Sequence, residues 1–377
     1  MHEVTRADVV IVGAGILGLA HAHEALKRGN SVIVIDRDER CLGASIRNFG
    51  FVTVSGLRGG DIWRRAVYSR DEWLNIAPEA GIDIEHRGTW LLVRHPMAWS
   101  VAEAFAATEM GEEIELVDRS QLSLRAPLLD DQEAVGALYS PHEVRVESVT
   151  AIPALTRWLG ERGARFLWGE EVLAAEGGSV WTSTREIRGQ RVVLCPGNSL
   201  SGIGQEYLTP YDITFSKLQM LRVMPRTPVR FDAAVMNDLS LARYQGYADL
   251  PEAKAWGEYL DEHEPALRAA GIHLIAVQSA DGSVVIGDSH DYGNDPDPFS
   301  SEAVDRMILD QFRSTTCVKE VDVISRWVGV YPTAEVDCVI EAPSPQQRIV
   351  VVTSGKGAST GFGIAKDVFD AWDGEAA

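Results

Sequence analysis

The stretch Asp8-Val-Val-Ile-Val-Gly-Ala-Gly-Ile-Leu-Gly18 decides the fold of this chain. It begins with an apolar, β-branched run and ends in the glycine pattern G-x-G-x-x-G. Residues 19–29 then keep apolar side chains at helical spacing and stop at a glycine, and residues 31–36 form a second apolar run. This succession of strand, glycine turn, helix and strand predicts a βαβ unit that binds a dinucleotide.

Each glycine of the pattern has a separate function in such a unit. Gly13 permits the tight turn, Gly15 lets the backbone approach a pyrophosphate, and Gly18 lets the helix pack closely on the strand. Asp36 follows Gly18 by 18 residues, at the end of the second apolar run, where a carboxylate accepts hydrogen bonds from ribose hydroxyls. The glycines alone would also fit an ordinary turn, but their position between strand and helix favours a dinucleotide.

A second glycine-rich loop, near the other end of the chain, favours FAD over NAD. The apolar run Arg348–Thr353 leads into Gly355-Lys-Gly357, and a helix is expected to begin near Ser359. Two chain ends that meet at one ligand suit a long cofactor, and the helix start would direct N–H groups and a positive dipole end toward the flavin ring. We therefore expect FAD, although a capped strand-to-helix turn would give the same sequence.

Composition and spacing disfavour several classes of protein. The chain has 377 residues and a formal net charge of −20, which disfavours binding to nucleic acid or anionic lipid. No apolar run is long enough to span a membrane, so we expect a cytoplasmic protein. We expect this protein to be a monomer or a homodimer. Segment 288–297 lacks the order of a calcium loop and is expected to be a solvated turn, so no metal site is predicted. Four separated cysteines are expected to be buried free thiols: Cys41, Cys195, Cys317 and Cys338.

The sequence pattern changes near Tyr211. Before it, helix-like and strand-like segments alternate, whereas after it several strand-like segments follow one another. Two of these are joined by the hairpin signal Ala280-Asp-Gly282. The end of the chain returns to alternating strand and helix, so two interleaved domains are predicted, one of them built from both chain ends.

Five segments of the chain occur in an order that resembles the FAD-dependent oxidoreductases of the D-amino acid oxidase, glycine oxidase and sarcosine oxidase superfamily. The resemblance implies an α/β (mixed α+β) fold, with a Rossmann-like FAD-binding domain of glutathione-reductase type interleaved with an antiparallel-sheet substrate domain. The segments are Val10–Leu19, Val193–Gly197, Asp281–Gly287, Trp327–Pro332 and Gly355–Gly357. The FAD-binding domain is expected at 1–82, 141–210 and 325–377, and the substrate-binding domain at 83–140 and 211–324.

The same resemblance extends to the family pattern S-x-x-N-x-G after the second strand. Ser45 and Asn48 match it and would bond the pyrophosphate and the ring edge, while Gly50 would let the backbone pass close to the ring. Arg47 would face the FAD phosphates, the acid group of the substrate, or solvent. The implied cofactor-binding residues are Gly13, Gly15, Ile16, Leu17, Gly18, Asp36, Arg37, Ser45, Arg47, Asn48, Gly50, Val172, Cys195, Pro196, Gly197, Gly329, Gly355, Lys356, Gly357, Ala358, Ser359 and Thr360.

Three departures from the family pattern concern the flavin, the substrate and oxygen. Sarcosine oxidase-like members carry a flavin-bonding cysteine where this chain has Gly329 and Val330, so FAD is expected to be non-covalent. Amino acid oxidases place a carboxylate-binding arginine where this chain has Tyr331, which disfavours a simple D-amino acid. The lysine used for oxygen activation corresponds to Val285, so both oxidase and dehydrogenase activity stay open, with O2 or another electron acceptor.

Another cation is therefore expected to bind the acid group of the substrate. Segments 45–54 and 271–278 resemble a subgroup associated with aminophosphonate catabolism. A planar arginine fork matches a carboxylate, and separate cations match a tetrahedral phosphonate equally well. The candidates are Lys356, Arg47, Arg326 and His290.

The resemblance implies oxidation of the C–N bond of a small amine that bears an anionic group, an amino acid or aminophosphonate. Hydride transfer to flavin N5 would give an imine that hydrolyses to an aldehyde or keto acid plus amine. An alternative is a 2-hydroxy acid oxidase or dehydrogenase, in which His290 would take the hydroxyl proton. Lys356 and Tyr331 are the implied catalytic residues. The implied substrate-binding residues are Arg47, Phe49, His290, Tyr331 and Lys356.

Overall fold

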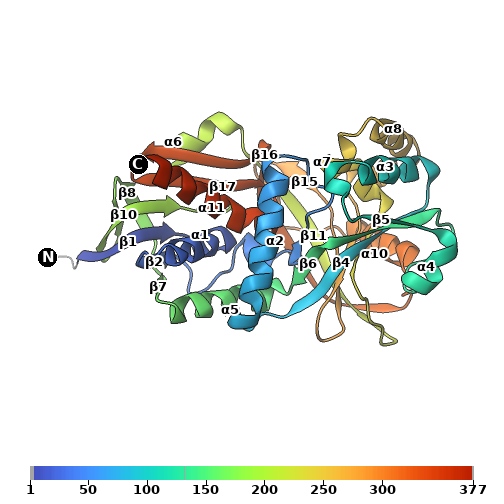
Figure 1. The fold of residues 1–377 in the computed structure, drawn as a ribbon, viewed down its shortest axis with the longest axis horizontal. Helices are drawn as coiled ribbons and strands as arrows, with labels where there is room; N and C mark the ends of the chain where they lie inside the picture. The colour runs from blue at the N-terminus through green and yellow to red at the C-terminus, as the bar shows by residue number, and fades with distance from the viewer. Residues whose placement is uncertain (1–3, 131, 376–377) are drawn as a thin grey trace.

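The apolar runs at both ends of the chain form one parallel sheet in the computed structural model, which describes residues 4–130 and 132–375 (Figure 1). At its centre, β1 (Val4–Val12) pairs with β2 (Val32–Asp36) on one side and with β10 (Glu186–Leu194) on the other. Beyond these lie β7 (Arg165–Trp168) and β17 (Gln347–Ser354). The order β7-β2-β1-β10-β17 brings the first and last strands of the chain to one sheet.

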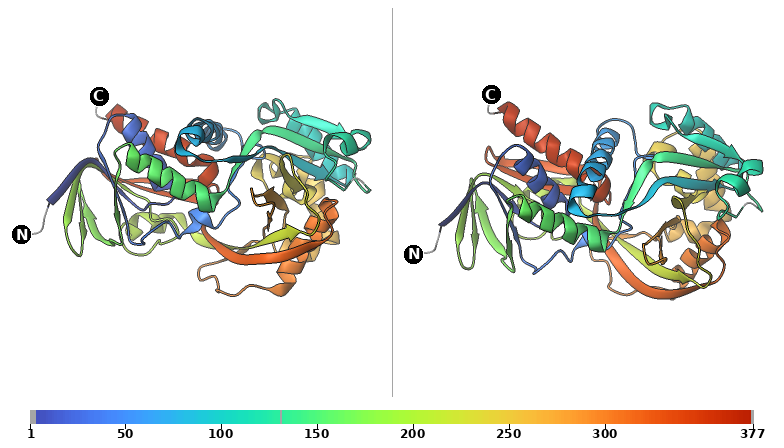
Figure 2. Two further views of the ribbon diagram at one scale, coloured as in Figure 1. Left: turned by 90° about the horizontal axis from the view of Figure 1, so that it is seen from below. Right: turned by 60° about the horizontal axis from the view of Figure 1, so that its bottom comes forward.

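Four helices cover one face of this parallel sheet (Figure 2). They are α1 (Ile16–Lys27), α2 (Asp61–Ala80), α5 (Ser148–Glu161) and α11 (Gly357–Glu375), and they contact one another around a shared apolar core. The short strands β8 (Val172–Glu176) and β9 (Ser179–Thr182) continue from β10 by antiparallel pairing.

A second, mixed sheet forms the other part of the molecule. Its strands run in the order β16-β11-β14-β13-β12-β4-β6-β5, and every neighbouring pair is antiparallel except β12 and β4. The predicted antiparallel sheet thus contains one parallel pair, β12 with β4, where a strand from the first half of the chain joins the sheet. The strands are β4 (Ile84–Val93), β5 (Glu115–Asp118), β6 (Gly136–Val146), β11 (Thr214–Pro225), β12 (Ala234–Asn237), β13 (Ile275–Gln278) and β14 (Val284–Gly287), with β3 (Phe51–Val52) paired to β6 and β15 (Asp291–Gly293) to β11.

One long strand, β16 (Val321–Ser344), belongs to both sheets. Residues 321–333 pair with β11, and residues from Thr333 onward pair with β17. The large apolar core of the second sheet and the core under the parallel sheet therefore meet along β16. This connection fixes the space between the two sheets, where the candidate site lies.

The remaining helices lie around the second sheet or pack against the parallel sheet and its helices. No helix in the described ranges is long and apolar enough to cross a lipid bilayer. These helices are η1 (Ala44–Ile46), α3 (Pro96–Ala106), η2 (Glu109–Gly111), α4 (Arg119–Arg125), α6 (Gln205–Leu208), η3 (Thr209–Tyr211), η4 (Asp238–Ala242), α7 (Gln245–Ala248), α8 (Ala253–His263), α9 (Pro265–Ala269) and α10 (Glu302–Thr315).

The predicted fold class is confirmed: a Rossmann-like parallel sheet joins a second sheet in an α/β arrangement. The domain borders stay a prediction, and two of them, at 140/141 and 324/325, fall inside the single strands β6 and β16. The prediction of four buried thiols is confirmed for Cys195 and wrong for Cys317, which is exposed, while Cys41 and Cys338 are half-buried. Cys317 lies just beyond α10, where the chain returns to the surface.

Candidate active site

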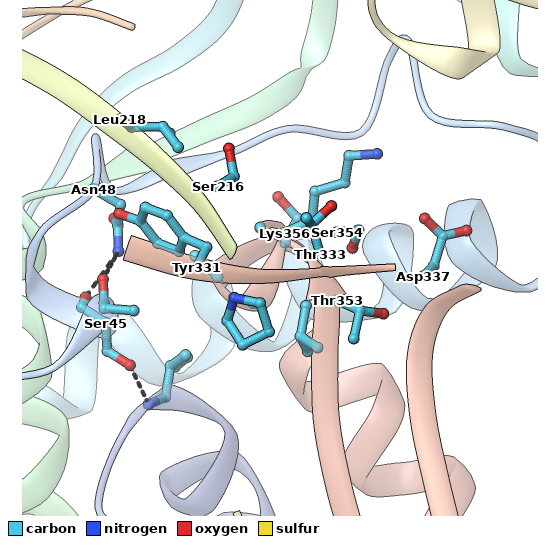
Figure 3. Close-up of a pocket in the computed structure, with 18 of the residues that line it drawn as sticks. Ser45, Asn48, Ser216, Leu218, Tyr331, Thr333, Asp337, Thr353, Ser354 and Lys356 are labelled. Atoms are coloured by element: carbon cyan, nitrogen blue, oxygen red, sulfur yellow. Dashed lines mark hydrogen bonds between the residues drawn. The ribbon is translucent and has the colours of Figure 1, made fainter. Parts of the chain in front are cut away.

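A cavity of about 380 Å³ lies where the two sheets meet, and both ends of the chain contribute to its wall (Figure 3). The glycine turn and the loop after β2 form one part, and the loop between β17 and α11 forms another. The second sheet closes the cavity with residues of β11 and of the segments beside β13 and β14. In Figure 3, Ser45 and Asn48 lie on one side of Tyr331, and Lys356 and Ser354 lie on the other.

The glycine turn places the start of α1 at the cavity. Gly13 has a φ of +104°, and a Cβ on Gly18 would lie 1.8 Å from the Gly13 carbonyl oxygen, so only glycine allows this close contact of strand and helix. The backbone N–H groups of Leu17 and Gly18 have no acceptor among the described residues, and both residues line the cavity. A helix start with unpaired N–H groups binds a phosphate group readily.

Two predicted cofactor residues make internal hydrogen bonds around this turn. The Ile16 N–H donates to Ser45 Oγ (2.9 Å), which ties the loop after β2 to α1. Asp36 Oδ2 accepts from the Ala14 N–H (2.7 Å), and the carboxylate does not line the cavity. Asp36 therefore holds the glycine turn in place in this structure.

The Asn48 side chain also makes its hydrogen bonds within the protein. Its amide donates to the carbonyls of Ala44 and Ser45, both at 3.0 Å. Its Oδ1 accepts from the Gly50 N–H (2.7 Å) and from Ser148 Oγ (2.6 Å). Asn48 thus shapes the loop whose backbone passes the cavity.

Tyr331 and Arg47 meet through the backbone. The Tyr331 hydroxyl donates to the Arg47 carbonyl (2.8 Å), and Trp327 Nε1 donates to the same oxygen (3.1 Å). Tyr331 is buried and lines the cavity, whereas the Arg47 side chain is exposed and does not line it. A Cβ on Gly329 would lie 2.5 Å from the Tyr331 ring, so the glycine makes room for this phenol. The phenol proton is engaged by the loop, and only its oxygen lone pairs face a ligand.

The loop after β17 brings Lys356 into the cavity wall. Helix α11 begins at Gly357, two residues earlier than the predicted start at Ser359, and Ser359 Oγ accepts from the Thr53 N–H (2.9 Å). Trp73 Nε1 donates to the Ala358 carbonyl (2.9 Å), so the first turn of α11 is fixed from two sides. In Figure 3 the Lys356 ammonium group extends away from the neighbouring Thr333 and Ser354.

The Lys356 ammonium group has no hydrogen-bond or ion-pair partner in the described part of the chain. It lies 6.0 Å from the centre of the Tyr244 ring. Burial lowers the pKa of Lys356, the Asp337 carboxylate acts in the opposite direction, and the charges of Arg243 and Arg58 lower it further. The positive charge of Lys356 is therefore balanced only in part, by the face of the Tyr244 ring and by the more distant Asp337 carboxylate.

Several cavity residues carry no recognisable motif and were not predicted. Arg243 and Tyr244 come from the turn between η4 and α7, and His273 and Asp288 come from the ends of β13 and β14. Segment 288–297 was expected to be a solvated turn, but Asp288 is only 4% exposed, because it lies against the second sheet. The hairpin signal contained a clue to this pair: a hairpin centred on 281, with Ile275 opposite Gly287, brings 273 beside 288.

Five buried polar atoms on the cavity wall lack a hydrogen-bond partner within the described residues. Unpaired buried polar atoms are costly, and they are usual where a ligand supplies the missing partners. Together with the unpaired N–H groups of α1, they fit a ligand with phosphates, hydroxyls and ring nitrogens such as FAD. The atoms are Ser216 Oγ, Gln245 Oε1, His273 Nδ1, Asp288 Oδ1 and Ser354 Oγ.

The structure gathers most of the predicted site residues at this one cavity. The predicted residues that line it are Gly15, Ile16, Leu17, Gly18, Ser45, Asn48, Phe49, Cys195, Gly197, His290, Tyr331, Gly355, Lys356, Gly357, Ala358 and Ser359. The predicted residues outside its wall are Gly13, Asp36, Arg37, Arg47, Gly50, Val172, Pro196, Gly329 and Thr360. Arg326 pairs with Asp305 (2.7 Å) and Val285 lies in the apolar core, and neither lines the cavity.

Comparisons with solved structures show the fold that this chain shares. It is similar to glycine oxidase from Geobacillus kaustophilus (19% identity, TM-score 0.78, covering 99% of this chain and 95% of that chain). It is also similar to L-proline dehydrogenase from P. horikoshii (18% identity, TM-score 0.77, 96% and 92%). A third similar structure is dithionite-reduced L-α-glycerophosphate oxidase from Mycoplasma pneumoniae with FAD bound (15% identity, TM-score 0.73, 98% and 95%).

The family follows from the sequence itself. A search of curated proteins gave no match. The family described as FAD dependent oxidoreductase (DAO) matches residues 8–371, which include both glycine-rich loops and the whole of β16. The chain therefore belongs to the DAO family of FAD-dependent oxidoreductases and is an FAD-dependent enzyme.

Proposed function

We propose that this enzyme oxidises the carbon–nitrogen bond of a small amine that carries an anionic group, either an amino acid or an aminophosphonate. One observation carries the proposal: two cations, Arg243 and Lys356, line the cavity without an ion-pair partner among the described residues. Other cations at the second sheet are neutralised, since Lys217 pairs with Asp297 (3.0 Å) and Arg326 with Asp305 (2.7 Å). In a chain with a net charge of −20, two unpaired cations in one cavity support an anionic ligand.

The arrangement of the two cations favours a wide anion. Arg243 donates to the Tyr292 hydroxyl (2.8 Å), which orients its guanidinium group at the cavity, while Lys356 approaches from the loop before α11. By the family resemblance, Tyr331 stands where amino acid oxidases have the planar arginine fork that faces a carboxylate. Two separate cations suit a tetrahedral phosphonate, so we propose an aminophosphonate as the first substrate to test.

The chain's own residues bind and orient the two reactants. The N–H groups of Leu17 and Gly18 would hold the pyrophosphate, and the first turn of α11 would direct its N–H groups at the flavin ring. When bound, FAD supplies the acceptor for the hydride that leaves the carbon next to nitrogen. In this proposal, the buried Phe49 and Tyr331 would keep water from the substrate, and the two cations would position its acid group.

We also propose that FAD is bound without a covalent link. Cys195 lines the cavity, but burial strongly raises the pKa of its thiol, so the reactive thiolate is disfavoured. Acid precipitation of the purified protein should leave all of the yellow colour in the supernatant, and a coloured pellet would show a covalent bond. Cytoplasmic location is part of the same proposal and is tested by fractionation of cells.

A 2-hydroxy acid is the second candidate substrate, and one observation favours it. His273, Asp288 and His290 lie together on the cavity wall, and such a group can accept the proton of a hydroxyl. O2 and other electron acceptors are both compatible with this site, since Val285 lies in the apolar core and supplies no amine for oxygen activation.

An anaerobic titration tests the proposal and separates the candidates. The flavin band near about 450 nm is followed while glycine, sarcosine, D-alanine, 2-aminoethylphosphonate, its N-methyl and hydroxy derivatives, and the 2-hydroxy acid glycolate are added one at a time. Bleaching by the phosphonate amines supports the first choice, and bleaching by glycine, sarcosine or D-alanine supports an amino acid. Bleaching by hydroxy compounds that lack an amine, or by none of these compounds, would reject the proposal.

A further inference from the structure

Three titratable residues form a buried cluster on the second-sheet side of the cavity. His273 is 3% exposed and Asp288 is 4% exposed, and His273 Nδ1 lies 3.4 Å from Asp288 Oδ1. His290 Nδ1 lies 3.9 Å from the same carboxylate oxygen. His273 precedes β13 and Asp288 follows β14, so the antiparallel hairpin of these strands brings the cluster together.

Hydrogen bonds hold the cluster in place at the cavity wall. The Asp288 N–H donates to the His273 carbonyl (3.1 Å), and His290 Nδ1 lies 3.1 Å from the Gly271 carbonyl, which holds the proton on that nitrogen. Two buried atoms then lack a hydrogen-bond partner in the described ranges, His273 Nδ1 and Asp288 Oδ1. Both atoms belong to cavity-lining residues, so a ligand with a donor group can supply the missing hydrogen bonds.

The groups that face Asp288 from neighbouring elements are mostly neutral. Among the described residues, Arg243 is the one cation whose charge acts on the carboxylate, and it acts from the turn before α7. The phenols of Tyr244 and Tyr331 also face it, and their pKa values are raised by burial. In the described part of the chain, only the two histidines lie within ion-pair distance of this carboxylate, and no Lys or Arg does, which suits a site that receives a cationic group.

Burial shifts the proton affinities of the cluster in opposite directions. It raises the pKa of Asp288 to about 7, while the Arg243 charge lowers it to a lesser extent. It lowers the pKa of His273 and of His290 well below the usual value, and the Arg243 charge adds to that effect. The cluster therefore changes its protonation near neutral pH.

We infer that Asp288, with His273 beside it, is the proton acceptor of this site, which receives the ammonium group of the substrate and takes up one of its protons. This inference rests on the proposed function. The N–H bond of the ammonium group breaks, its electron pair stays on nitrogen, and the proton passes to the pair. The neutral amine is then oxidised to an imine as hydride leaves the adjacent carbon, and the FAD of this enzyme family is reduced.

The need for such an acceptor follows from the amine. An alkylammonium group has a pKa of about 10, so at about pH 7.5 only about 1 molecule in 300 is the neutral amine. Removing the acceptor should therefore lower the rate of flavin reduction by about 10²-fold at that pH. Raising the pH should restore the rate, because the amine then loses its proton to solvent.

The decisive experiment compares Asp288→Asn with the wild type by anaerobic stopped-flow from about pH 6 to 10. The exposed Asp291, three residues later, provides the matched control Asp291→Asn. We expect the wild type to lose rate below about pH 7, and Asp288→Asn to be slow at pH 7.5 and to recover toward pH 10. A wild-type rate in the variant at pH 7.5, or a rate that stays low up to pH 10, would overturn the inference. A purely structural role would not give recovery with pH.

Calorimetry on the wild type gives a second readout, which needs no turnover and no folded variant. The ligands are 2-aminoisobutyrate and 2-amino-2-methylpropylphosphonate, whose carbon next to nitrogen bears no hydrogen. Titrations in two buffers of different ionisation enthalpy count the protons released on binding. For 2-aminoisobutyrate, whose acid group does not titrate in this range, we expect about one proton at pH 6 and about none at pH 8.5. For the aminophosphonate, the protons released by its phosphonate group are subtracted by means of a parallel titration with ethylphosphonate, which has no amine.

The outcomes of these experiments distinguish a failure of the inference from a failure of the proposed function. If no amine bleaches the flavin of the wild type at any pH, the proposed function fails. If amines bleach it but proton release on binding does not depend on pH, the proton acceptor alone is wrong. Loss of the pH-dependent release after treatment with a chelator would show a bound metal ion in the cluster and would also overturn the inference.

Discussion

Arg243 and Lys356, the two cavity cations without an ion-pair partner in ranges 4–130 and 132–375, give a quantitative prediction for substrate binding. Arg243→Met removes a half-buried guanidinium group but keeps an unbranched side chain, and Lys356→Met does the same for the ammonium group. A hydrogen bond to a charged group contributes about 1.5–3 kcal/mol, which is about 10- to 150-fold in Kd. Each variant should therefore weaken binding of the anionic amine by one to two powers of ten.

The assay is a titration of the flavin spectrum with an anion that lacks the amine, ethylphosphonate or acetate, and then flavin reduction by the matching amine. Arg58→Met is the control, because Arg58 is exposed, pairs with Asp249 (2.6 Å) and does not line the cavity, although its charge reaches Lys356. Its Kd should stay close to that of the wild type. If both cations bind one anion, the double variant should lose less than the two single losses combined, because the sites are coupled.

Two results would refute this reasoning. Unchanged anion binding in both Arg243→Met and Lys356→Met would mean that the acid group lies elsewhere. An equal loss for an amine whose acid group is masked as an ester would mean that the variants disturb the cavity in general.

Three further predictions concern the glycine turn, the loop after β2 and the buried carboxylate. Gly18→Ala should abolish FAD binding, because the new Cβ would lie 1.8 Å from the Gly13 carbonyl oxygen. The control Gly160→Ala should keep FAD, because its Cβ would have no atom within 4 Å. The measurement is the FAD content per protein chain, and full FAD content in Gly18→Ala would contradict the prediction. Tyr331→Phe loses the hydrogen bond to the Arg47 carbonyl and should raise the Kd for FAD by about 5-fold, or about 1 kcal/mol, and an unchanged Kd would show that Trp327 alone holds that carbonyl. The pKa of Asp288 is raised to about 7 in the folded protein, so the stabilising contribution of its neutral form is complete below about pH 4 and is lost as the pH rises through 7. In urea titrations, the free energy of unfolding of Asp288→Asn minus that of the wild type should therefore increase by up to roughly 4 kcal/mol between pH 4 and pH 8. A difference that does not change with pH would contradict the raised pKa of Asp288.

The parts of the site that a local pattern encodes could be predicted from the sequence. The turn at Gly13–Gly18 is fixed by steric contacts among neighbours in the chain, and the loop at Ser45–Gly50 by hydrogen bonds within a few residues. Such contacts leave a spacing that a sequence can show. For the same reason, the strands at 8–12, 31–36 and 348–353 and the helices after the two glycine-rich loops were expected close to where they lie.

The parts of the site that depend on sheet register could not be predicted from local patterns. Arg243 reaches the cavity only because η4 and α7 turn there, and His273 meets Asp288 only through the pairing of β13 with β14. The length of β16 was equally hidden, since its two halves pair with different sheets. The direction of the Tyr331 hydroxyl depends on a carbonyl 284 residues away in sequence.

The central claim is that the cavity oxidises an amine that it holds by its anionic group. Its most direct test is the anaerobic rate of flavin reduction by 2-aminoethylphosphonate and by its diethyl ester, with glycine and glycinamide as the carboxylate pair. The account predicts that at least one free acid reduces the flavin about 10²-fold faster than its masked form at low substrate concentration, which is the effect expected from two charged hydrogen bonds. Equal rates for the free and masked forms of both pairs would contradict it.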